Sequence, residues 1–102
     1  MTVYVDALVN YGLKGKSAKV QRVFAAGSCH LFTDSLDLTE LHAMAARIGM
    51  RRAWFQTNGD LPHYDLNAVR RASAVTAGAV ETDKYKTVEC IRLHRAAKWG
   101  AP

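Results

Sequence analysis

Short apolar segments alternate with amphipathic ones along this chain of 102 residues. Residues 2–8 alternate and are rich in Val and Tyr, which predicts a strand. One apolar helix face is indicated by the spacing of Leu38, Leu41, Ala45 and Ile48. The pattern as a whole predicts strands at residues 2–8, 29–33, 53–56 and 79–82, and helices at residues 38–48, from 65 or 67 to 77, and 88–98.

This order of elements predicts an α/β fold. Helices separate the later strands, so at least part of the sheet should be parallel. We expect residues 1–102 to form a single small domain with a mixed or mostly parallel sheet of about four strands and about three helices. Residues 20–26 fit a strand or a loop equally well.

Polar residues and glycines mark the ends of the expected helices. Asp37 and Glu40 have the spacing of a capping pair at the start of the first helix. Gly49 and Gly78 are natural stops for the first and second helices. These signals predict where the helices begin and end.

Composition limits the classes of function. The chain is 49% hydrophobic and 23% charged, which is typical of a globular protein. No apolar run approaches the roughly 20 residues of a membrane span, and the first residues do not resemble a signal peptide. We expect a cytoplasmic protein, in a bacterium or in the host cell if a phage encodes it. The net charge of +5 favours anionic partners.

The two cysteines do not indicate a disulfide framework, and a Gly-Lys-Ser segment does not indicate a phosphate-binding loop. Cys29 and Cys90 are far apart, so we expect two reduced, buried thiols and no disulfide framework. Residues 12–17 end in Gly-Lys-Ser, but a phosphate-binding loop needs a glycine where this chain has Asn10. We therefore interpret this segment as a basic loop.

Polar and titratable side chains are concentrated around the end of one predicted strand. Residues 53–56 are expected to lead into a loop that contains His63, Tyr64 and Asp65 and precedes a helix with two arginines. Strand ends in α/β sheets are a usual place for ligands. The ends of other strands should bring Asp6 and Asp34 to the same side.

Several short motifs, in the same order, resemble the DUF4031 family of small bacterial and phage proteins of unknown function. They are Tyr4-Val5-Asp6, Cys29-His30-Leu31-Phe32 with Asp34, Glu40-Leu41-His42-Ala43, Ala46-Arg47-Ile48-Gly49, Trp54-Phe55-Gln56, His63-Tyr64-Asp65-Leu66 and Gly78-Ala79-Val80. This chain departs from the family pattern at Ala7, where a second acidic residue is frequent, and in a longer segment at residues 10–28. The resemblance implies which positions matter but supplies no reaction.

The residue types indicate a histidine-centred site for an anion. We predict His30, His63 and Asp65 as catalytic groups, because imidazoles and carboxylates exchange protons near neutral pH. The predicted ligand-binding residues are Asp6, His42, Arg52, Trp54, Gln56, Tyr64 and Arg70. A structural interpretation remains open, in which Asp65 caps a helix and His42 is a partly buried, hydrogen-bonded histidine.

Three functions follow as hypotheses. The first is binding of a phosphorylated, nucleotide-like small molecule in this pocket, with acid/base chemistry on it or without. The second is a nucleic-acid-associated accessory protein that holds phosphates through its basic loops. The third is a metal-dependent nuclease or hydrolase; no spacing matches a known metal motif, so the sequence assigns no metal or cofactor. The weakly amphipathic last helix also suggests a homo-oligomer that covers Val88 and Ile91.

Overall fold

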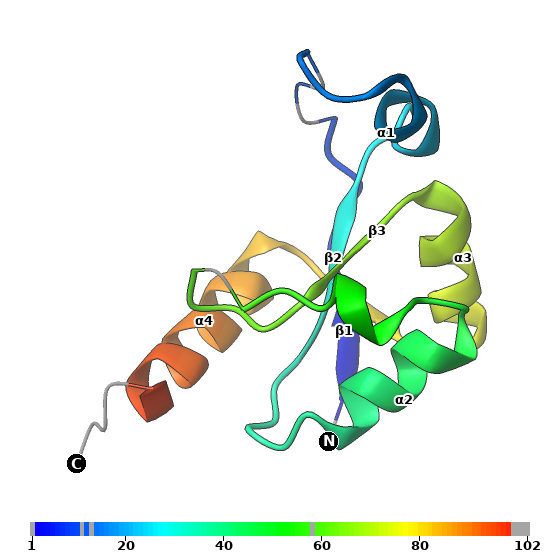
Figure 1. The fold of residues 1–102 in the computed structure, drawn as a ribbon. Helices are drawn as coiled ribbons and strands as arrows, with labels where there is room; N and C mark the ends of the chain where they lie inside the picture. The colour runs from blue at the N-terminus through cyan, green and yellow to red at the C-terminus, as the bar shows by residue number, and fades with distance from the viewer. Residues whose placement is uncertain (1, 11, 13, 58, 99–102) are drawn as a thin grey trace.

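The computed structural model describes residues 2–10, 12, 14–57 and 59–98. Its elements in chain order are β1 (Val3–Val5), α1 (Ala18–Val23), β2 (Cys29–Thr33), α2 (Thr39–Arg47), the 3-10 helix η1 (Arg52–Trp54), β3 (Tyr64–Leu66), α3 (Ala68–Thr76), β4 (Val80–Glu81) and α4 (Lys84–Lys98). The four strands form one mixed sheet, which confirms the predicted α/β class (Figure 1).

The sheet has the strand order β3-β2-β1-β4. β1 pairs antiparallel with β2 and parallel with β4, and β2 pairs antiparallel with β3. The prediction that part of the sheet is parallel is therefore confirmed for the β1–β4 pair. In the β2–β3 register His30 lies opposite Asp65, and Leu31 lies opposite Tyr64.

Helices cover both faces of the sheet. α2 and α3 lie on one face and α4 on the other (Figure 1). Successive strand residues point to opposite faces, so each strand contributes to both layers. The face under α2 and α3 holds the larger core, which includes Val5, Cys29, Leu31, Leu41, Tyr64 and Leu66.

The face under α4 holds a smaller core. Phe32, Leu61 and Cys90 are its buried members, and Tyr4 and Ile91 pack against them. His30 and Asp65 lie on this face too, because they alternate with core residues of the other face along β2 and β3. Ile91 thus has an intramolecular partner, while Val88 is 43% exposed.

Two helices begin and end close to their predicted positions because their end signals act locally. Asn67 caps α3 through its side-chain oxygen, which accepts a hydrogen bond from the backbone N–H of Arg70. Gly49 and Gly78 have φ of +83° and +111°, a conformation that favours glycine after a helix. Both predicted glycine stops are therefore confirmed.

Tyr64–Leu66 forms β3 and not the predicted loop, and two further expected segments are also wrong. Residues 53–56 do not form a strand: Arg52–Trp54 is a 3-10 helix, and Gln56 makes only an isolated bridge with His63. Residues 20–26 are neither strand nor loop at their start, because Ala18–Val23 is helical and its N-terminus is capped by Ser17. In both cases an apolar stretch of a few residues was too short to reveal its period.

Asp34 does not lie with Asp6. β1 and β2 are antiparallel, so the residues that follow them are at opposite ends of the sheet. Asp34 accepts hydrogen bonds from the backbone of Thr2 and the hydroxyl of Tyr4. The predicted gathering of strand ends on one side is therefore wrong for Asp34.

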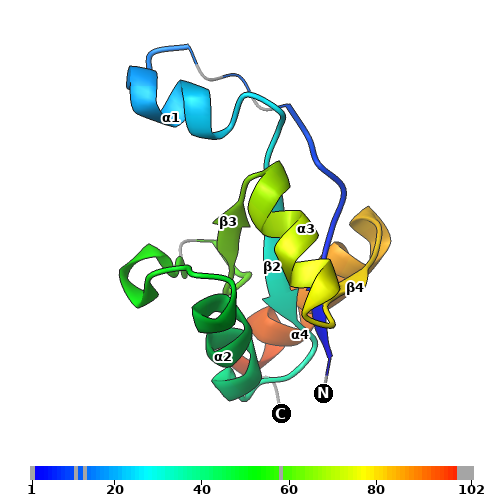
Figure 2. The ribbon, with the colours of Figure 1, turned by 90° about the vertical axis from the view of Figure 1, so that its right-hand side faces the viewer.

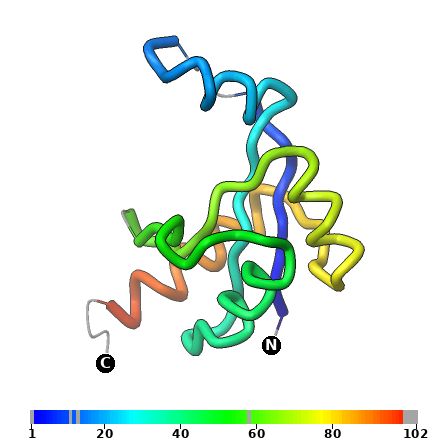
Figure 3. Tube along the Cα trace, turned by 45° about the vertical axis from the view of Figure 1, so that its right-hand side comes forward, coloured from blue at the N-terminus to red at the C-terminus, as the bar shows by residue number. Residues whose placement is uncertain are grey.

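α1 stands apart from the other helices at one end of the molecule (Figures 2 and 3). It contributes no buried residue to either core. Among the residues that the structure describes, no helix has both the length and the apolar character needed to cross a membrane.

Candidate functional site

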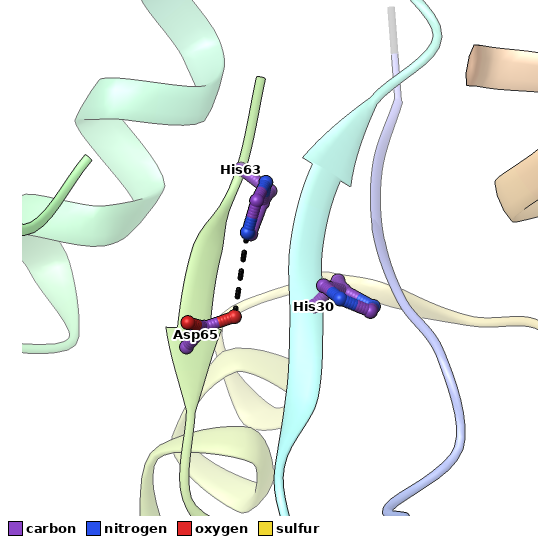
Figure 4. Close-up of side chains that lie close together, drawn as sticks. All are labelled: His30, His63 and Asp65. Atoms are coloured by element: carbon purple, nitrogen blue, oxygen red, sulfur yellow. Dashed lines mark ion pairs between the residues drawn. The ribbon is translucent and has the colours of Figure 1, made fainter. Parts of the chain in front are cut away.

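His30, His63 and Asp65 come together on the α4 face of the sheet. Asp65 lies opposite His30 across the β2–β3 pair, and His63 precedes Asp65 by two residues, which puts it on the same face. Nε2 of His63 is 3.4 Å from Oδ1 of Asp65, and the His30 and His63 ring centroids are 5.0 Å apart. We call this group the histidine–aspartate cluster (Figure 4).

The carboxylate of Asp6 fixes the orientation of His30. Its Oδ1 accepts the backbone N–H of His30 at 2.7 Å, and its Oδ2 accepts the ring Nδ1–H at 2.7 Å. Burial raises the pKa of Asp6, but the hydrogen bonds from His30 outweigh burial, and the net pKa lies below its ordinary value. Asp6 therefore positions His30, and its oxygens are already occupied.

Two residues that we did not predict hold Asp6 in place. The hydroxyl of Thr87 donates to Oδ2 of Asp6 at 3.2 Å, and Nε of Arg71 donates to the Asp6 carbonyl at 2.8 Å. Arg71 also forms an ion pair with Glu81. These contacts join residues 65 and 81 positions apart in the chain, so no local sequence pattern indicates them.

His63 is held from both ring nitrogens. Its Nδ1–H donates to the carbonyl of Leu61 at 2.6 Å, and Nε2 faces Asp65. Burial lowers the pKa of His63, but the Asp65 carboxylate and the Leu61 carbonyl outweigh burial, and the net pKa is above its ordinary value. A protonated His63 therefore forms an ion pair with the Asp65 carboxylate.

Asp65 connects this pair to a neighbouring cavity. Its Oδ2 accepts a hydrogen bond from Nε2 of Gln56 at 2.6 Å. The pKa of Asp65 is lowered, first by the hydrogen bond from His63, with burial acting against it and Gln56 adding to it. Asp65 is thus an anion that contacts His63 on one side and Gln56 on the other.

The cavity has a volume of about 780 Å³ and lies between α1, η1 and the start of α3. Ligand sites in proteins commonly have volumes of roughly 300–1,000 Å³. Its polar and aromatic lining consists of Lys19, Phe24, Trp54, Gln56, Asp65, Asn67 and Arg70. Three predicted ligand-binding residues, Trp54, Gln56 and Arg70, therefore border one cavity.

His42 and Tyr64 lie on the opposite face of the sheet from the histidine–aspartate cluster. Nδ1 of His42 is hydrogen-bonded to the Tyr64 hydroxyl at 2.8 Å, and Tyr64 is only 1% exposed in the larger core. Burial and the positive charge of Arg52 lower the pKa of His42. The structure thus separates these two residues from His30, with which we had grouped them, because Tyr64 and Asp65 are neighbours on one strand.

Arg52 belongs to the same surroundings as His42. Its guanidinium carbon lies 4.8 Å from the centre of the Phe55 ring, and that ring packs edge-on against His42. Arg52 does not line the cavity, whereas Arg70 does. Of the two predicted arginines, only Arg70 is therefore placed for a ligand in this cavity.

Both cysteines are buried and free, in agreement with the prediction. Cys29 precedes His30 but points into the larger core. Burial raises the pKa of the Cys29 thiol to about 12. This thiol is therefore protonated at neutral pH and does not take part in the cluster.

The histidine–aspartate cluster has the donor groups of a metal site. His30, His63 and Asp65 each offer a ligand atom, and these atoms all lie within 4.8 Å of one another. Two imidazoles and one carboxylate are a frequent donor set for divalent transition metals. The same groups can also act as an acid/base pair without a metal, as described for His63.

Fold and site together define a small α/β protein with a half-buried histidine–aspartate cluster beside a cavity. The chain belongs to the DUF4031 family, described as proteins of unknown function, whose family model matches residues 16–94. The match includes the whole histidine–aspartate cluster and leaves out β1 and Asp6. No curated protein and no solved structure matches the chain.

Proposed function

We propose that this protein binds a phosphorylated, nucleotide-like small molecule in the cavity between α1, η1 and α3. The observation that supports this most is the combination of Trp54 with Lys19 and Arg70 around one cavity of suitable volume. An indole offers a stacking surface for a base, and the two cations attract phosphate.

The geometry of Arg70 suits a phosphate near the start of α3. Its guanidinium donates to the carbonyl of Ile48, the C-cap of α2. A guanidinium carries five N–H donors, so this bond leaves donors for an anion. α3 has no acidic residue in its first turn, and the positive end of its dipole adds to the attraction.

The pair of His63 and Asp65 gives the cavity an acid/base group at its edge. Asp65 lines the cavity, and Nε2 of His63 lies 3.4 Å from its Oδ1. A ligand oriented by Trp54 and Arg70 would thus meet a proton donor or acceptor on the side of Asp65. The proposal covers a binding protein and an enzyme, and the presence of this pair favours acid/base chemistry on the ligand.

Native mass spectrometry of gently purified protein is the direct test. We expect a mass increment of nucleotide size that disappears on denaturation. Affinity for the identified nucleotide, or for a panel of nucleoside phosphates, is then measured by calorimetry. Each of Lys19→Gln and Arg70→Gln should weaken binding roughly tenfold or more, because each removes a charge-assisted contact.

Arg52→Gln is the matched control. Arg52 is a cation of the same type and the first residue of η1, but its guanidinium lies over the Phe55 ring and it does not line the cavity. This variant should bind as the original protein does. Equal losses in Arg52→Gln and Arg70→Gln would indicate general electrostatic attraction and would count against the cavity. Thermal denaturation of each variant shows that the fold is retained.

A further inference from the structure

We propose that His30, His63 and Asp65 bind one divalent transition-metal ion, with two imidazole nitrogens and one carboxylate oxygen as its protein ligands. The three ligand atoms lie within 4.8 Å of one another on one face of the sheet (Figure 4). This site goes beyond the proposed ligand binding, and the argument for it rests on the cluster alone.

The distances allow one ion to reach all three groups after a small adjustment. Ligand atoms around a tetrahedral zinc ion lie roughly 3.3 Å apart, given metal–ligand bonds of about 2.0–2.1 Å. The His63–Asp65 separation of 3.4 Å already has this value. The other separations, of up to 4.8 Å, must shorten by roughly 1.5 Å when an ion binds, through small movements of the side chains.

The hydrogen bonds around the cluster leave the correct nitrogens for a metal. Nδ1–H of His30 donates to Asp6, and Nδ1–H of His63 donates to the Leu61 carbonyl. Each ring can therefore present the lone pair of Nε2. Metal-binding histidines usually donate their other N–H to a carboxylate or a carbonyl in this way.

A hydrogen bond also orients the third ligand, Asp65. Gln56 donates to Oδ2 of Asp65, and Oδ1 faces His63. An ion would lie between Nε2 of His63 and Oδ1 of Asp65. All three ligands thus have a partner that fixes their orientation, which is the feature that separates this cluster from a chance group of polar residues.

The donor set indicates the class of metal. Two nitrogens and one oxygen suit zinc, cobalt or iron(II) better than calcium or magnesium, which prefer oxygen ligands. A thiolate is not available, since Cys29 points into the larger core. Three protein ligands leave at least one coordination position open, as in catalytic zinc sites. Asp65 also lines the cavity, whereas His30 and His63 do not.

The experiment uses the full chain without a histidine tag, freed of metal by a chelator and then dialysed. Titration with Co²⁺ is followed by visible absorption, and Zn²⁺ is then added to displace it. We expect one ion per chain, with a spectrum typical of tetrahedral or five-coordinate cobalt. His63→Gln and Asp65→Asn should each lower the affinity by about 100-fold or more, and Asp6→Asn by about 10–100-fold through His30.

His42→Gln is the matched control, because His42 is a partly buried histidine on the opposite face of the sheet. It should bind cobalt as the original protein does. Zinc should also raise the melting temperature of the original protein and of His42→Gln, but not that of Asp65→Asn. The melting transition of each variant without zinc shows whether a variant that fails to bind is still folded.

Unchanged affinity in His63→Gln and Asp65→Asn, or loss in His42→Gln to the same extent, would overturn the metal site. These measurements contain no nucleotide, so they do not depend on the cavity ligand. Conversely, nucleotide binding that persists in chelator but is lost in Arg70→Gln would support the cavity while the metal site fails. The two proposals can therefore fail separately.

Discussion

The two faces of the sheet use histidine in opposite ways. On the face under α2 and α3, His42 packs against Phe55 and is hydrogen-bonded to the buried Tyr64 hydroxyl. On the face under α4, His63 contacts the Asp65 carboxylate and lies beside a second imidazole. Tyr64 and Asp65 are neighbours, so a single step along β3 separates the core from the candidate site.

The partners of His42 and His63 explain why the pKa values of the two histidines shift in opposite directions. Burial lowers the pKa of His42, and Arg52 lowers it further, while the phenol of Tyr64 supplies no opposing charge. Burial also lowers the pKa of His63, but Asp65 and the Leu61 carbonyl reverse the effect. The histidine next to the apolar core thus has a lowered pKa, whereas the histidine next to a carboxylate has a raised pKa.

The largest expected difference between the two faces is in stability. Tyr64→Ala should lower the free energy of unfolding by about 3 kcal/mol or more, because it leaves a cavity in the larger core. Asp65→Ala should lower it by less than about 1 kcal/mol, since Asp65 is partly exposed and its ion pair is weak. Urea denaturation of both variants measures the two losses in free energy of unfolding. Equal losses would mean that the two faces do not differ as described.

A smaller effect isolates the hydrogen bond between His42 and Tyr64. Tyr64→Phe keeps the ring and removes the hydroxyl, and should cost about 1 kcal/mol because Nδ1 of His42 loses its partner. Tyr4→Phe is the control: its hydroxyl bonds to Asp34 on the other face at 3.2 Å, in a less buried position. Tyr4→Phe should therefore lower the free energy of unfolding by less than Tyr64→Phe does. A double-mutant cycle of Tyr64→Phe with His42→Gln should show coupling, and additive losses would contradict the bond.

Local sequence signals predicted the elements whose ends are fixed by nearby residues. β2, α2 and α3 lie close to their expected positions. Helix periodicity acts over a few residues, and so does the side-chain cap of Asn67 at the start of α3, whereas α2 begins without a side-chain cap at Leu38. α1 was missed although Ser17 is a suitable cap residue, because residues 20–26 fitted a strand or a loop and are too few to show a helical period. α4 begins at Lys84, before its expected start at residue 88. The side chain of Asp83 accepts hydrogen bonds from the backbone N–H groups of Tyr85 and Lys86 at this earlier start.

The site was predictable only in part, because it depends on strand pairing. The proximity of His63 to Asp65 follows from their spacing alone. The position of His30 depends on the antiparallel pairing of β2 with β3, which no sequence pattern indicated. The roles of Arg71 and Thr87 arise from still longer contacts. The separation of His42 and Tyr64 from the site likewise required knowing that residues 64–66 form a strand and not a loop.

The smallest expected effect concerns pH and tests the neutral state of His42. Its pKa in the folded protein lies below 6.5, the ordinary value that the unfolded chain should show. The unfolded state therefore binds more protons as the pH falls through 6.5, and this group lowers stability on the acidic side. The loss should begin near pH 6.5 and level off below the folded pKa. Unfolding by urea between pH 7.5 and pH 5 measures it, with the imidazole of His42 followed by NMR.

His42→Gln is the reference for this titration, because it keeps a polar side chain and removes the titrating group. Over the same range it should lose less stability than the original protein does. The difference between the two curves then belongs to His42 alone, since all other titrating groups are shared. An equal loss in both proteins, or an NMR titration of His42 above 6.5, would show that this histidine is not a neutral member of the core. The contrast between the two faces of the sheet would then rest on burial alone.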